Sequence, residues 1–207
     1  MILRDTVDAA LADPRATEGF RRRVSALAGA QGVALGPEDE AAIAEMGARY
    51  VRETVRLIES CATAAGQARA DAMMKPLTGA AEGFFLRPPP GLPEPRGLFG
   101  MICAAFLARS TLRAVSEAMR LRRGFPLIAA DPHPEAGTIR ALLGEGLARS
   151  LDAMLEDALA APGLRHFANM AWSLQNSLHA TGRISEWGPT WADEMARRSA
   201  RIGFRLT

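Results

Sequence analysis

Apolar residues recur at intervals of three and four along most of this chain, which is the period of an amphipathic α-helix. The clearest stretch opens at Pro37 and meets no helix-breaking residue before Pro76. A proline followed by three acidic residues suits a helix N-terminus, because proline needs no amide partner there and carboxylates oppose the helix dipole. The pattern therefore predicts one long central helix over about residues 37–75.

Shorter stretches with the same period predict further helices on either side. They are expected at about residues 2–12, 16–31, 98–122, 134–161 and 164–181, with a last helix after Gly188-Pro189. The 98–122 stretch is apolar nearly all round in its first half, which places it at the centre of a bundle. Gly144 and Gly146 weaken the 134–161 helix and indicate either a close contact or a break.

Between the two longest helices lies a proline-rich segment, residues 87–96. Proline excludes helix there and favours an extended polyproline II path, so we interpret the segment as a stiff connector, with at most one helical turn over residues 79–86 before it. The segment also contains the spacing Arg87-x-x-Pro90-x-x-Pro93, which SH3-type grooves bind. The steric requirement of a connector explains the same residues, and it is the interpretation we favour.

Composition supports the same fold class. The 207 residues are 48% hydrophobic and only 6% aromatic, and the apolar share is carried by helix-favouring alanine, leucine and methionine. No stretch alternates between apolar and polar residues over the length of a strand. We predict a single all-α domain over residues 1–207, a bundle of about six to seven helices, with residues 1–34 as a candidate peripheral arm.

Charge and cysteine usage indicate a cytoplasmic protein. The net charge is +2, which produces no strong bulk field toward nucleic acid or membrane. Cys61 and Cys103 fall inside helical patterns without CxxC spacing, as expected of two buried free thiols in a reducing compartment. Charged residues interrupt the N-terminal stretch, and the longest apolar run, residues 98–108, is about half a membrane span. We therefore expect no signal peptide and no membrane span.

Motifs that carry chemistry are missing from the sequence. Its three histidines have no metal-ligand spacing, and no nucleophile elbow, Walker motif or dinucleotide fingerprint occurs. We expect no metal, no cofactor and no catalytic residue, so the interpretation leans away from an enzyme.

One helical face stands out as a candidate binding surface. Opposite the apolar stripe of the 164–181 helix lies a tryptophan among amides, a histidine and arginines, and such a ring can stack on a partner. In the alternative, Trp172 packs under the last helix beside Trp187 and Trp191. The candidate face consists of Arg165, Asn169, Trp172, Asn176, His179 and Arg183.

These observations predict a non-enzymatic helical protein that binds another macromolecule, a protein, through this face or through a secondary anion-binding candidate near the C-terminus, Arg197, Arg198, Arg201 and Arg205. Self-association of the chain stays open. One alternative is a small-molecule-binding bundle or an enzyme, with a pocket between helices near His166 and His179. The other is nucleic-acid binding through arginine clusters, which also occur at residues 21–23 and 120–123.

Overall fold

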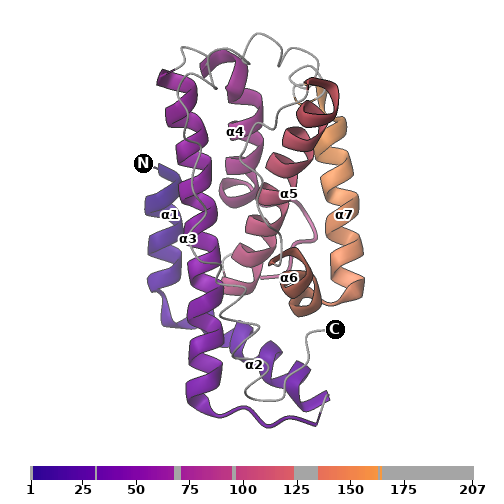
Figure 1. Ribbon diagram of the computed structural model, residues 1–207. Coiled ribbons are helices and arrows are strands. Elements are labelled where there is room, and N and C mark those ends of the chain that lie inside the picture. Colours follow the sequence, from indigo (N-terminus) through magenta and orange to yellow (C-terminus); the bar gives the residue numbers. More distant parts are fainter. Residues whose placement is uncertain are drawn as a thin grey trace.

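The computed structural model describes residues 2–30, 32–67, 71–94, 97–123, 135–162 and 164. Helices make up 87% of this part of the chain, which contains seven helices and no strand. The all-α bundle predicted from the sequence is thus confirmed (Figure 1). The helices are α1 (Ile2–Ala12), α2 (Pro14–Ala30), α3 (Pro37–Gln67), α4 (Asp71–Leu86), α5 (Leu98–Arg123), α6 (Glu135–Leu143) and α7 (Glu145–Ala160).

Helix α5 is the centre of the bundle, as its all-round apolar first half predicts. It packs against α2, α3, α4, α6 and α7, and every residue from 98 to 109 is buried. The stretch Leu98–Ala118, with a mean hydropathy of 1.5, is the one helix in the described part that is long and apolar enough to cross a membrane. In the bundle 83% of its most apolar window is buried, as in the core helix of a globular protein.

The helix predicted over residues 37–75 is confirmed over Pro37–Gln67, but it does not continue as one helix to residue 75. Helix α3 ends at Gln67, and α4 resumes at Asp71, includes Pro76 and continues through residues 79–86. Because only three residues separate these two helices, which pack together, α4 folds back along α3 (Figure 1). Pro76, the sixth residue of α4, removes one amide donor near the helix start, and burial of Leu77, Ala81 and Phe84 offsets that loss.

The predicted helix 134–161 is broken at Gly144, which separates α6 from α7. Gly144 has a φ of 78°, a left-handed conformation that glycine adopts without a steric cost. The Arg23 guanidinium of α2 donates a hydrogen bond of 2.6 Å to the Leu143 carbonyl at the end of α6. Arg140 and Asp152 form two hydrogen bonds, of 3.1 and 2.7 Å, that tie α6 to α7.

The connector between α4 and α5 does not follow one extended path. Gly91 has a φ of 90°, and the Leu92 amide donates to the Pro89 carbonyl at 3.3 Å, so the chain turns between Pro90 and Pro93. Leu92 is buried in the core of the bundle. The Arg87-x-x-Pro90-x-x-Pro93 spacing is therefore not presented as a polyproline II helix in this fold, which agrees with its interpretation as a connector.

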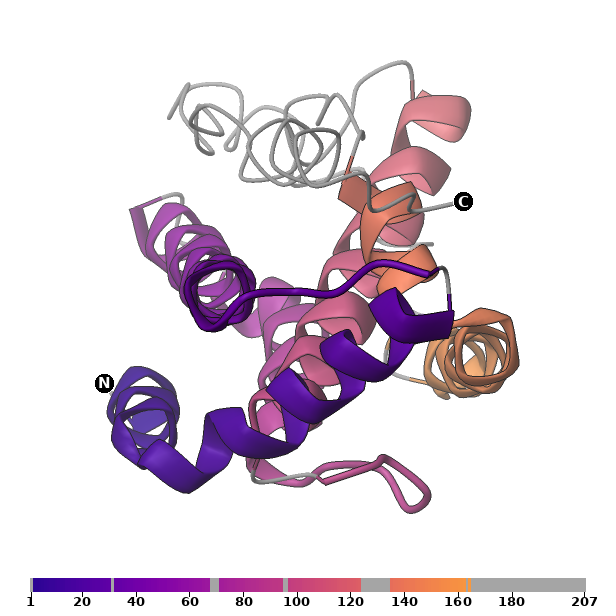
Figure 2. The same cartoon turned by 90° about the horizontal axis from the view of Figure 1, so that it is seen from below.

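Helices α1 and α2 attach to the same core. Leu3 and Val7 of α1 are buried, and the Phe20 ring of α2 lies 6.5 Å from the Phe99 ring. Figures 1 and 2 both show α1 beside α3, on the side of the bundle away from α7. This placement brings the polar residues of α1 against those of α3.

Candidate anion-binding site

The binding residues predicted from the sequence lie outside the described residues. This holds for the whole Arg165 to Arg183 face, for the Arg197 to Arg205 group and for His166 and His179. They stay predictions. A different site, between α1 and α3, is formed by residues that the structure describes.

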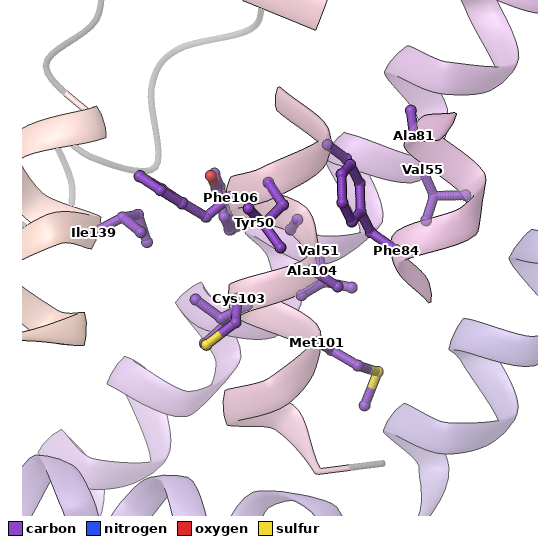
Figure 3. Close-up of a cluster of buried hydrophobic side chains, with 14 of the residues drawn as sticks. Tyr50, Val51, Val55, Ala81, Phe84, Met101, Cys103, Ala104, Phe106 and Ile139 are labelled. Atoms are coloured by element: carbon purple, nitrogen blue, oxygen red, sulfur yellow. The ribbon is translucent and has the colours of Figure 1, made fainter. Parts of the chain in front are cut away.

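A hollow of about 110 Å³ lies between α1 and α3, and each helix contributes the same three-residue pattern to it. The pattern is an arginine, a valine three positions later and a charged residue after that, so all three side chains share one helix face. Val7 and Val55 are buried and form the floor, while the charged groups form the walls. Figure 3 shows Val55 beside Ala81 and Phe84 of α4, which hold this floor in place. The lining residues are Arg4, Val7 and Asp8 of α1 and Arg52, Val55 and Arg56 of α3.

Two of the three arginines already have acidic partners. Arg4 of α1 is hydrogen-bonded and ion-paired to Glu59 of α3, and this hydrogen bond, followed by the charge of Glu59, raises the pKa of Arg4. Arg52 lies 3.1 Å from a Glu45 oxygen and 3.9 Å from an Asp8 oxygen. These pairs cross between the two helices or line the edge of α3, so they also position the guanidinium groups around the hollow.

The third arginine, Arg56, is exposed and makes no hydrogen bond or ion pair with any described residue. The lining carries three guanidinium groups and one carboxylate. The Glu59 and Glu45 carboxylates balance the charges of Arg4 and Arg52, so Arg56 is the guanidinium without a partner among the described residues. Guanidinium groups bind carboxylates and phosphates through paired N–H donors. The hollow is therefore suited to one anionic group.

This site is not among those predicted from the sequence. Arg52 and Arg56 lie among charged residues of alternating sign in α3, a pattern that is typical of a helix face exposed to solvent. The repeated spacing of arginine, valine and a charged residue in two helices could have pointed to these two helix faces. The spacing alone does not show that α1 packs on this face of α3.

A second polar cluster is buried between α3 and α5. Arg109 donates from Nε to the Thr54 hydroxyl at 2.8 Å, its guanidinium lies 4.4 Å above the Tyr50 ring, and it is 3.6 Å from a Glu53 oxygen. Glu53 also lies 3.9 Å from Arg49. Arg109 is only 6% exposed, so its guanidinium serves to connect two core helices.

Of the three arginine clusters, only residues 21–23 have described side chains, and Arg22 and Arg23 have separate structural partners. Arg23 lies 4.3 Å from the Phe99 ring centre and caps α6, whereas Arg22 lies 3.8 Å from Glu18. A cation above an aromatic face and an i, i+4 pair are both common packing devices. The arginines of this cluster are therefore spread over the surface and the core of the bundle, and they do not form one anion-binding face.

Both cysteines are free and buried, as predicted. Burial raises the pKa of each thiol to about 12. In the described residues no three histidine, cysteine or acidic side chains are grouped so that they could hold a metal ion. Searches of protein-family models, of curated proteins and of solved structures find no match to this chain.

Proposed function

We propose that this helical bundle acts by binding another protein, and that an anionic group of the partner occupies the pocket between α1 and α3. The observation that carries the proposal is the convergence of three arginines on one hollow, with Arg56 exposed and without a partner among the described residues. Binding without catalysis is the activity proposed.

The size of the pocket favours a macromolecular partner over a small molecule. Sites for small organic ligands enclose roughly 300–1,000 Å³, whereas this hollow measures about 110 Å³. It accommodates one charged group, so the rest of the ligand lies outside on the exposed faces of α1 and α3. A charged side chain that projects from the surface of a partner protein fits this description, because its charged end enters the hollow and the rest of the partner stays outside.

The ion pairs that line the pocket are weak enough to rearrange. Asp8 and Arg52 are 3.9 Å apart and roughly half exposed, with 54% and 40% of their side chains accessible. An exposed pair of this kind contributes about 0–1 kcal/mol. A partner anion with better geometry can replace Asp8 on Arg52 at little cost.

We further propose that the protein works in the cytoplasm. Two buried cysteines that remain free thiols are suited to a reducing compartment. The Trp172 face is a separate proposal for a second contact with a partner, and it depends on residues other than those of the pocket.

The test compares pocket variants with a matched control. Arg52→Gln and Arg56→Gln remove one charge each from the pocket, and Arg22→Gln removes one from the exposed face of α2. Cross-linking in cells identifies proteins that bind the wild type but not the pocket variants. These proteins are purified, and each is titrated directly against the wild type and the three variants.

We expect Arg56→Gln to weaken binding about tenfold or more, Arg22→Gln to change it less than about twofold, and added salt to weaken the wild-type complex. Partners that bind Arg56→Gln and Arg22→Gln equally well would refute the proposal. Circular dichroism of each variant verifies that the fold is intact.

A further inference from the structure

We infer that the anionic group recognised between α1 and α3 is a phosphate monoester, so that the pocket distinguishes a phosphorylated side chain from an ordinary acidic one. The inference rests on the proposed function, because it specifies which partner group occupies the same pocket. Two properties of the lining support it: its hydrogen-bond donors and its arrangement over two helices.

The donors of the lining outnumber what a carboxylate can accept. A guanidinium has five N–H donors, and the bonds made by Arg4 to Glu59 and by Arg52 to Glu45 each use one nitrogen. Arg56 bonds to none of the described residues, so its whole set of donors is open to a ligand. A carboxylate offers two oxygens, whereas a phosphate monoester offers three strongly accepting oxygens.

The donors also surround the hollow from two elements. Arg52 and Arg56 are one turn apart on α3, and Arg4 reaches the same hollow from α1. A tetrahedral oxyanion directs its oxygens away from one another and so contacts both helices, which a planar carboxylate does less well. The buried floor of Val7 and Val55 keeps water from one side of the bound group and strengthens its attraction to the arginines.

The probe is an array of immobilised heptapeptides with a central phosphoserine and random flanking residues. The same peptides with a central glutamate or serine serve as controls, and inorganic phosphate is titrated separately and as a competitor. The protein is used as the full chain, in the wild-type form and as Arg56→Gln. Arg149→Gln on α7 is the matched control, because Arg149 is exposed and its one ion pair with a described residue is the i, i+4 pair with Glu145.

We expect a subset of phosphoserine peptides to bind at least about tenfold more tightly than their glutamate versions, with inorganic phosphate competing for the pocket. Arg56→Gln should lose about tenfold in affinity and Arg149→Gln less than about twofold. Nuclear magnetic resonance signals of the arginine side-chain N–H groups should shift at Arg4, Arg52 and Arg56 on titration with phosphate.

Equal binding of phosphoserine and glutamate peptides would refute the phosphate inference and leave the proposed function standing. Binding of inorganic phosphate without any phosphoserine peptide would also refute it, because the site would then serve a free phosphorylated compound. Absence of all binding would refute both proposals.

Discussion

At the scale of single residues, the buried Arg109 shows how a charge is accommodated inside an apolar helix. The Glu53 carboxylate balances its charge, and the Thr54 hydroxyl accepts a hydrogen bond from its Nε–H. The flat face of its guanidinium packs on the Tyr50 ring. A buried ion pair adds little net stability relative to apolar packing, but removal of one partner leaves an uncompensated group. The Thr54 hydroxyl therefore contributes to the stability of the fold by satisfying a buried donor of Arg109.

We predict that Thr54→Val lowers the free energy of unfolding by about 1–3 kcal/mol, because the Nε–H of Arg109 loses its acceptor in a buried site. Urea denaturation measures the change. Thr111→Val is the matched control, since Thr111 is equally buried and its hydroxyl bonds to the Leu107 carbonyl of its own helix. Equal losses in the two variants would show that the bond to Arg109 contributes nothing.

A second prediction concerns Cys61 and Cys103, whose pKa burial raises to about 12. Both thiols should react slowly with a thiol reagent in the native protein at pH 8 and promptly in urea, because the thiolate is the reactive form. An unfolded thiol has a pKa of about 8.5, so above that pH ionisation favours the unfolded state. The free energy of unfolding should therefore fall as pH rises from about 8.5 toward 12, and Cys61→Ala should reduce that slope. Prompt native labelling would mean that the thiols are accessible.

At the scale of the helices, two glycines of similar sequence context have opposite roles. Gly144 ends α6 with a positive φ, whereas Gly146 lies within α7 and its missing Cβ would meet nothing within 4 Å. The first glycine is required by the backbone conformation, and the second only weakens a helix.

We predict that Gly144→Ala lowers the free energy of unfolding by about 1–2 kcal/mol, since a side chain in the left-handed region is strained. Gly146→Ala should instead raise it by about 0.5–1 kcal/mol through better helix propensity. Thermal denaturation of the two variants gives the comparison. The same sign of change in both would contradict the assignment of the break to Gly144.

At the scale of the whole molecule, charge is distributed in local arrangements and gives no single basic face in the described part. The net charge is +2, Arg22 and Arg23 have separate partners, and Arg4, Arg52 and Arg56 surround a small hollow. Nucleic-acid binding requires several cations aligned along a phosphate backbone.

We therefore predict no detectable binding to nonspecific duplex DNA at physiological salt, measured by fluorescence anisotropy. The C-terminal group from Arg197 to Arg205 is included in this test when the full chain is used. Micromolar affinity that falls steeply with salt would revive the nucleic-acid alternative.

The sequence by itself determined the features that depend on neighbouring residues along the chain. The helical period predicted an all-α fold, and the acidic first turn after Pro37 placed the start of α3. The all-round apolar character of residues 98–108 placed α5 at the centre, because such a helix has no face that favours water. The helical context of the two cysteines predicted their burial.

Only the tertiary structure decided where the chain reverses and which faces meet. Local preference favours helix on both sides of Gln67, and the return of α4 along α3 follows from the burial of Leu77, Ala81 and Phe84, which involves residues distant in sequence. The break at Gly144 likewise depends on Arg23, over one hundred residues earlier. The pocket of Arg4, Arg52 and Arg56 exists because α1 covers a charged face of α3, and hydrophobic periodicity shows that a helix has two faces without showing what packs on each.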